Sequence, residues 1–253
     1  MIVNLIFEFI YTNYLIHKMN TCKNCSINFD TKYCPDCGTP AITKRIDKHY
    51  VWHELQHGIF HFEKGFFYTT KELLINPGHA VRKFIEGDRL KHYKPIGYVI
   101  ICSIIYTLSE HYFDTETKHR SSSDGIVVKW IFEHYSYSNL IEIIFIAFML
   151  QLFFRKEKYT YFENCVLCCY LTGFTMLIGA IYTLFIFLTN LETLDSLFFF
   201  LIMFVYMAWG IGQFYDKKTW WTYFKAFFVY LISFTLYYVF AILLDKLINI
   251  IKI

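Results

Sequence analysis

FENCVLCCYLTGFTMLIGAIYTLFIFLT, residues 162–189, is apolar over a length sufficient to cross a lipid bilayer as one helix, since a span needs about 20 predominantly apolar residues. Four further apolar runs lie near residues 95–113, 139–154, 196–215 and 220–244. The chain is 56% hydrophobic and 21% aromatic, which is typical of a membrane protein. Backbone polar groups in lipid must be hydrogen-bonded within the chain. The sequence therefore predicts an all-α integral membrane protein with a bundle of about five transmembrane helices in residues 95–253.

Basic residues predict the orientation of this bundle, because short loops rich in Lys and Arg stay in the cytoplasm. Such residues are frequent before Pro95, in RKEK (155–158) and in DKK (216–218), and five spans place all three segments on one side. The connection NLETLD (190–195) contains no Lys or Arg. We therefore expect the amino-terminal region inside and the carboxyl end outside. The net charge of +3 gives no reason to expect a nucleic-acid partner.

Four cysteines in residues 19–42 give the strongest chemical signal in the sequence. Cys22-x-x-Cys25 and Cys34-Pro-Asp-Cys37-Gly38 are two knuckles whose separation suits one tetrahedral zinc ion. Two disulfides or free thiols are the alternative, which a reducing cytoplasm disfavours. Four sulfur ligands leave no open coordination position, so a zinc ion here would be structural and would supply the folding energy of a small ribbon.

The other four cysteines and residues 1–18 give weaker signals. Cys102, Cys165, Cys168 and Cys169 fall in apolar runs, where burial as small hydrophobic side chains is expected. Residues 1–18 form an apolar leader without a cationic start or a cleavage site, so a signal peptide is not expected. The leader is either untranslated, with Met19 as the start, or an extra interfacial or transmembrane helix.

HELQH, residues 53–57, matches the H-E-x-x-H pattern in which two histidines hold zinc and the glutamate is a general base. We therefore keep a membrane-attached zinc metalloprotease, using His53, Glu54 and His57, as an alternative function. Two features weaken it. His49, His53, His57 and His61 recur every four residues and form one polar stripe of an amphipathic helix. A third zinc ligand would have to come from Glu72, His79, Glu86 or His92, which stand in no recognisable pattern.

The stretch INPGHAVRKFIEGDRLKHYKP (75–95) completes the amphipathic, juxtamembrane segment 43–94. Asn76 is expected to cap a helix that starts at Pro77 and ends at Gly87. The basic residues here are Arg82, Lys83, Arg89, Lys91 and Lys94. They predict either contact with anionic lipid head groups near Arg82–Lys94 or an ordinary positively charged flank of the first span.

The order of these elements resembles a known family. The chain is similar to the bacterial membrane proteins of the domain-of-unknown-function family numbered 3667. The similar segments are, in order, the two knuckles, GFFYTTKELLINPGHAVRKFIEGDR (65–89), Lys94-Pro95 and the later stretch GQFYDKKTWWTYFKAFF (212–228). Its characteristic elements here are Thr-x-x-x-Leu, Pro77-Gly78 and Gly87-x-Arg89. One departure is Thr39, where glutamine is expected; we place it at the rim of the ribbon. The resemblance implies a zinc ribbon ahead of a multi-span domain in a bacterial inner membrane, and no reaction.

Polar residues in the apolar runs support a third functional hypothesis. Glu142, Gln151, Glu163 and Gln213 could line a path for an ion or a small solute. Alternatively they form hydrogen bonds between helices, with Glu142 and Glu163 near enough to an interface to be wetted. The run at 139–154 is the weakest predicted span, because it is short and carries Glu142 and Gln151.

The sequence favours a non-catalytic role. We expect the ribbon, with one structural zinc ion on Cys22, Cys25, Cys34 and Cys37, to present a surface to an unidentified protein partner at the membrane. Proteolysis and small-solute or ion transport are the alternatives.

Overall fold

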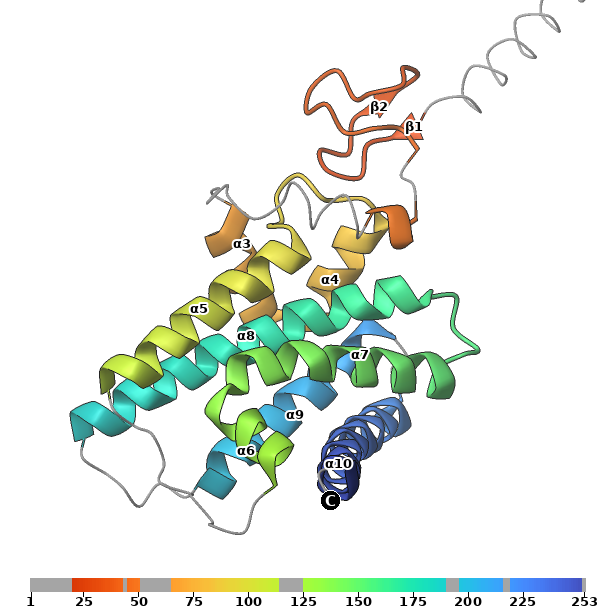
Figure 1. Cartoon of the computed structure of the whole chain (residues 1–253). Coiled ribbons are helices and arrows are strands. Elements are labelled where there is room, and N and C mark those ends of the chain that lie inside the picture. The colour runs from red at the N-terminus through yellow and green to blue at the C-terminus, as the bar shows by residue number, and fades with distance from the viewer. Residues whose placement is uncertain are drawn as a thin grey trace, which may run out of the picture.

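The computed structural model describes residues 20–42, 45–50, 65–113, 125–189, 196–215 and 219–251. In this part of the chain a small two-stranded element lies at one end of a group of helices (Figure 1). Strands β1 (Asn20–Thr21) and β2 (Asn28–Phe29) are antiparallel, with Asn20 opposite Phe29 and Thr21 opposite Asn28. The predicted order of a small cysteine-containing ribbon before helices is therefore observed.

Each of the five predicted apolar runs forms a helix. Their bounds are α5 (Pro95–Phe113), α7 (Tyr135–Phe153), α8 (Tyr161–Thr189), α9 (Ser196–Phe214) and α10 (Trp220–Ile251). Helix α7 begins four residues before the predicted run, and α10 continues seven residues beyond its predicted end. Local apolar content fixed the positions of these helices, but it did not show where their more polar ends stop.

Three of these helices are long and apolar enough to cross a membrane: Pro95–Phe113, Tyr161–Thr189 and Trp220–Ile250. The apolar parts of α7 and α9, Tyr137–Phe153 and Phe198–Phe214, are shorter. Within the described residues, the structure thus gives three candidate spans, and the larger number of about five stays a prediction.

Two shorter helices, α3 (Gly65–Ile75) and α4 (Pro77–Glu86), form a hairpin that packs against the ends of α8 and α9 nearest the ribbon. Helix α4 starts at Pro77 and ends before Gly87, as predicted. The φ angle of Gly87 is 128°, which a residue with a side chain rarely adopts. Asn76 makes no side-chain hydrogen bond to the helix, so the predicted capping bond was wrong.

Helix α8 lies in the middle of the bundle and packs against α5, α7 and α9 (Figure 1). Its contact with α5 is close because Gly173 faces α5. A Cβ atom at residue 173 would lie 2.9 Å from Cδ1 of Tyr98 and 3.2 Å from Cα of Val99. Small residues allow helix backbones to approach in this way. Tyr98, Tyr170 and Leu171 are fully buried where these helices meet.

The remaining helix, α6 (Ile126–Glu133), packs against α7 and α10. Its amino-terminal amides are satisfied by a carboxylate from α10: Val127 N donates to Asp245 Oδ1 at 2.7 Å, and Val128 N donates to Oδ2 at 3.1 Å. A negative charge at a helix amino terminus is favourable because it meets free N–H groups. Asp245 thus fixes α6 to a helix more than one hundred residues later in the chain.

Candidate metal centre

The two cysteine knuckles have the same backbone hydrogen bonds. In the first, Ser26 N donates to Cys22 O at 2.9 Å and Cys22 N donates to Ile27 O at 2.8 Å. In the second, Gly38 N donates to Cys34 O and Cys34 N donates to Thr39 O at the same distances. Ser26 and Gly38 both have positive φ angles, 62° and 73°. Glycine adopts this conformation without cost, whereas Ser26 does so with a side chain.

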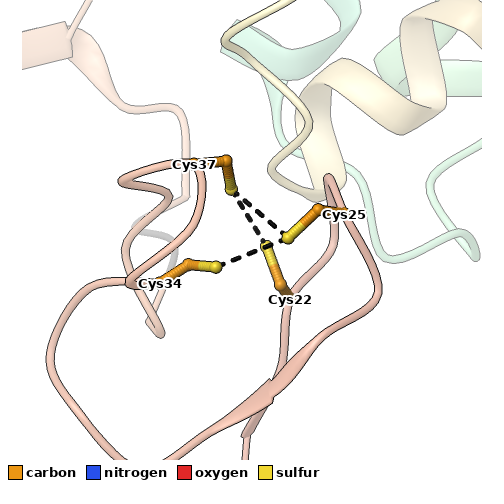
Figure 2. A group of neighbouring side chains, drawn as sticks. All are labelled: Cys22, Cys25, Cys34 and Cys37. Atoms are coloured by element: carbon orange, nitrogen blue, oxygen red, sulfur yellow. Dashed lines mark hydrogen bonds between the residues drawn. The ribbon is translucent and has the colours of Figure 1, made fainter.

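These turns direct four thiol groups toward one point (Figure 2). The Sγ atoms of Cys22 and Cys37 are 3.4 Å apart, those of Cys25 and Cys34 are 3.4 Å apart, and those of Cys25 and Cys37 are 3.6 Å apart. All four sulfur atoms lie within 4.8 Å of one another, and none of the four is in a disulfide. The cluster could therefore bind a metal ion, as the spacing predicted.

Thr39 is part of this centre, which corrects its predicted place at the rim. The residue is only 2% exposed, and its Oγ1 lies 3.1 Å from Cys37 Sγ. Hydrogen bonds from the Thr39 hydroxyl and the Thr39 amide lower the pKa of the Cys37 thiol to about 6. Because a thiolate is the form that binds metal, Thr39 prepares Cys37 to be a ligand. Its position after Cys37-Gly38 was the only sequence signal for this role.

The other residues considered as ligands do not join the cluster. Among the residues with described positions, Cys22, Cys25, Cys34 and Cys37 form the one group of three or more His, Cys, Asp or Glu side chains close enough together to hold a metal ion. Cys102 and Cys168 are fully buried, in agreement with the expected hydrophobic role, whereas Cys165 and Cys169 are only partly buried. Residues 53–57 and His61 lie outside the described residues, whereas His49 is exposed.

Two of the proposed third zinc ligands have other contacts. Glu72 Oε2 lies 3.5 Å from Lys83 Nζ. His92 is buried between the rings of Tyr68 and Phe84, and its Nδ1 lies 2.8 Å from Asp88 O. Burial lowers the pKa of His92. Neither residue belongs to a group of described His, Cys, Asp and Glu side chains close enough together to hold a second metal ion.

The first knuckle also contacts the helical part of the protein. Lys23 Nζ donates to Glu86 O at the end of α4, and Lys91 Nζ donates to Asn24 O at 3.3 Å. Lys23 and Asn24 stand between the two cysteines of this knuckle. These two contacts attach the ribbon through its first knuckle, and Tyr33 and Ile42 elsewhere on the ribbon are exposed.

A second attachment follows the ribbon. Arg45 Nε donates to Glu163 Oε1 at 3.1 Å, Arg45 Nη2 donates to Oε2 at 2.9 Å, and Nη2 also donates to Lys158 O. Glu163 is 2% exposed rather than wetted, so that prediction was wrong. The adjacent Ile46 is buried in the main core. Sequence gave no signal for the pairing of Arg45 with Glu163, because the two residues are 118 positions apart.

The predicted family elements make contacts that explain the residues they contain. Thr69 Oγ1 accepts a hydrogen bond from Tyr93 N at 2.8 Å, and Leu73 O accepts one from the hydroxyl of Tyr206 at 3.1 Å. Arg89 lies over the rings of Tyr50 and Phe84, at 5.1 and 5.7 Å from their centroids. These contacts join α3 to α9 and to the loop before α5, and they join that loop to α4.

Pro77-Gly78 lies against the end of α9. A Cβ atom at residue 78 would be 2.2 Å from Phe214 N and 2.4 Å from Gly210 O. Gly78 N donates to Gln213 Oε1 at 3.2 Å. One turn later, Arg82 Nη2 donates to Gln213 O at 2.7 Å and Nε donates to Phe214 O at 3.1 Å, so Arg82 satisfies carbonyls at the end of α9. The two stretches that carry the resemblance, 65–89 and 212–228, thus contact each other.

These contacts change the interpretation of the basic segment. Arg82, Lys83, Arg89 and Lys91 all bind groups of this protein, while Lys94 is exposed. Much of this positive charge therefore holds the hairpin and the ribbon in place. Contact with anionic lipid remains a prediction, with less charge available for it than the sequence suggested.

Comparison with known proteins confirms part of the resemblance. Residues 63–107 match the model of a family described as a protein of unknown function (DUF3667). This segment contains the α3–α4 hairpin and most of α5. The ribbon and residues 212–228 lie outside the matched segment. No curated protein and no solved structure matches the chain.

Proposed function

We propose that the protein is a multi-span membrane protein whose ribbon carries one structural zinc ion and has a non-catalytic, partner-binding role at the membrane. The observation that carries this proposal is the arrangement of the four sulfur atoms of Cys22, Cys25, Cys34 and Cys37 around one point. The family match is compatible with the proposal but assigns no activity.

Zinc suits the size and chemistry of the cluster. Four sulfurs at about 2.3 Å from a tetrahedral zinc ion would be about 3.8 Å from one another. Three of the sulfur–sulfur distances, 3.4, 3.4 and 3.6 Å, are close to this value, and all four sulfur atoms lie within 4.8 Å of one another. Thiolates favour zinc over the hard cations Ca²⁺ and Mg²⁺. When bound, zinc would cross-link the two knuckles, and the four cysteines would occupy every coordination position.

The packing of the ribbon supports a structural role for the metal. Its buried apolar core consists of Cys22, Phe29 and Cys34, with few partly buried neighbours. Such a core is too small to stabilise a fold alone, so metal binding would provide the folding free energy. A zinc ion without an exchangeable ligand position does not activate water, which favours a binding role over catalysis.

The attachment of the ribbon supports its use as a binding surface. Contacts through Lys23 and Asn24 fix the ribbon to α4 and the loop before α5. Tyr33 is 63% exposed and Ile42 is 83% exposed on the remaining surface. Tyrosine is enriched in protein interfaces and in their hot spots, and Ile42 adds exposed apolar surface beside it on the ribbon. We propose that this surface binds a protein partner on the cytoplasmic side of a bacterial inner membrane.

The orientation has structural support from charges near the ribbon. Arg155, Lys156 and Lys158 lie in the α7–α8 connection, which contacts Arg45, and Lys225 Nζ donates to Phe153 O at the end of α7 at 2.7 Å. These basic residues are therefore at the same end of the bundle as the ribbon, as the positive-inside rule predicts for a cytoplasmic face. With five spans, a carboxyl-terminal alkaline phosphatase fusion is expected to be active and a fluorescent-protein fusion inactive.

Zinc counting tests the metal proposal. We expect about one zinc ion per chain in detergent-purified protein, lost in the Cys34→Ser/Cys37→Ser variant and retained in the His53→Ala/His57→Ala variant. Zinc absent from the wild type would refute the proposal. A second zinc ion lost only with the histidines would instead favour the metalloprotease, with Glu54 as its candidate base.

Site-specific photo-cross-linking tests the binding role. A photoreactive residue at Tyr33 should give a discrete protein adduct in cells, and the adduct should disappear in the Cys34→Ser/Cys37→Ser background. The matched control is Tyr112, which is 77% exposed near the end of α5 away from the ribbon. Equal labelling at both positions, or an adduct that does not depend on the cysteines, would argue against a partner-binding ribbon.

A further inference from the structure

A small cavity lies where α5, α7, α8, α9 and α10 meet, and its volume is about 20 Å³. Every one of these helices contributes to its lining. The lining residues with side-chain oxygen atoms are Tyr106, Asn139, Glu142, Thr172, Thr175 and Tyr230. A space of about 10–15 Å³ is enough for one water-sized particle. The cavity therefore has room for one small ligand and a high content of oxygen atoms.

Glu142 is the unusual residue in this lining. It is 7% exposed, and its Oε1 atom is buried without a hydrogen-bond partner in the described structure. The prediction that Glu142 is wetted at an interface was therefore wrong. Native proteins rarely leave a buried carboxylate oxygen without a partner, because its desolvation is then uncompensated. This oxygen consequently indicates that a ligand belongs in the cavity.

Neighbouring hydroxyl groups favour a cation as that ligand. The Tyr106 hydroxyl donates to Glu110 Oε1 at 2.6 Å, and the Thr175 hydroxyl donates to Thr172 O at 2.8 Å. Because each hydroxyl has one proton and two lone pairs, a hydroxyl oxygen that donates its proton can also act as an acceptor. Among the described residues, none that lines the cavity is Lys, Arg or His. A carboxylate here would thus need another source of positive charge.

The titratable groups that line the cavity or interact electrostatically with Glu142 from the other helices carry no positive charge near physiological pH. Titratable side chains near it are Tyr106 of α5, Cys168 of α8, and Tyr230, Tyr237 and Tyr238 of α10. The contributions of α9 to the cavity are Phe199 and Met203, which do not titrate. Tyrosine and cysteine lose a proton only at higher pH and would then add negative charge, so none of them can neutralise Glu142.

We propose that this cavity is a binding site for one small monovalent cation, held by the Glu142 carboxylate and by oxygen atoms of the lining. The cation is Na⁺ or H⁺, both of which are small enough and would neutralise the carboxylate. The site lies in the half of the bundle away from the ribbon, since Tyr106 is in the second half of α5 and Phe199 is at the start of α9. It is independent of the proposed zinc site.

The test measures thermal unfolding of the full-length protein in detergent at about pH 8, in NaCl or in choline chloride of equal ionic strength. Choline is too large for the cavity. If Na⁺ is the ligand, NaCl raises the unfolding midpoint of the wild type. Glu142→Gln keeps the shape of the side chain but should abolish this rise. Glu86→Gln, which changes an exposed carboxylate outside the cavity, should keep it.

A second pair of variants covers the case in which Glu142→Gln does not fold. Thr172→Val preserves side-chain shape and removes one lining oxygen, so it should weaken Na⁺ binding by about tenfold or more. Thr183→Val is the matched control, because Thr183 is also buried on α8 but does not line the cavity. Equal Na⁺ dependence in these two variants would contradict coordination by the lining.

Infrared spectroscopy separates the two cations. If H⁺ occupies the site, the wild type shows no specific effect of Na⁺ and has a protonated carboxyl C=O band near neutral pH that Glu142→Gln lacks. Two results would overturn the proposal. One is an Na⁺ effect that persists in Glu142→Gln; the other is an ionised Glu142 in a protein that is insensitive to Na⁺.

Discussion

Replacement of Gly78 by alanine should destabilise the protein although alanine is the better helix former. The new Cβ atom would lie 2.2 Å from Phe214 N, 2.4 Å from Gly210 O and 2.5 Å from Gln213 Cβ. Two of these atoms belong to the backbone of α9 and cannot move by a rotamer change. Since ordinary contacts begin near 3.4 Å, α4 and α9 must separate by about 1 Å.

The expected cost follows from this separation. Overpacking of a tight contact costs about 1–3 kcal/mol. The movement also lengthens the bonds from Arg82 to the end of α9, and hydrogen bonds of charged groups contribute about 1.5–3 kcal/mol. The higher helix propensity of alanine offsets about 1 kcal/mol of this loss of stability. We therefore expect a net loss of about 1.5–5 kcal/mol in the free energy of unfolding.

Denaturant unfolding of the detergent-solubilised protein, followed by tryptophan fluorescence, measures this loss. His79→Ala is the control, because His79 is the next residue on α4 but is exposed, and it should change stability by less than about 0.5 kcal/mol. Arg82→Met should be destabilising alone and less than additive with Gly78→Ala, since both variants lose the same bonds. A Gly78→Ala protein as stable as the wild type would refute the proposed tight contact between α4 and α9.

Three further predictions concern the ribbon and its attachment. Gly38→Ala should weaken zinc affinity by about 1–2 kcal/mol, because the φ angle of Gly38 is 73°, whereas Ser26→Gly should leave zinc affinity equal or improve it. Competition with a chelator measures both affinities, and weaker zinc binding by the Ser26→Gly variant would contradict the strain argument. Arg45→Met should destabilise the protein because Glu163 would stay buried without its cation, but the loss should be smaller than the about 3–5 kcal/mol of a fully buried pair, since Arg45 is 61% exposed. The unfolding midpoint measures this loss; Lys48→Met, at an exposed residue nearby, is the control, and an equal effect of both variants would exclude a specific role of the pair. Burial lowers the pKa of His92, so just below the ordinary pKa of histidine the unfolded chain binds more protons than the folded one, and the free energy of unfolding should fall as the pH drops through about 6.5. His92→Gln should remove this part of the pH dependence, and an unchanged pH profile of the variant would show that His92 does not cause it.

The sequence alone determined the features that depend on local composition and spacing. Long apolar runs predicted helices α5, α7, α8, α9 and α10, because a chain in an apolar environment satisfies its backbone hydrogen bonds locally in a helix. Pro77 and Gly87 fixed the bounds of α4 through their backbone angles. The two C-x-x-C turns predicted a cluster of thiols, since each turn needs only a few neighbouring residues.

The tertiary structure alone decided which polar residues are buried and what they contact. The burial of Thr39 depends on the folding of one knuckle against the other. Arg82 and Glu163 find their partners 132 and 118 residues away, on elements that no local pattern connects. Glu142 becomes a candidate cation ligand only because five helices converge around it. Local sequence shows which groups are costly to bury, but the positions of distant helices decide which group is buried and which other residue or ligand can satisfy it.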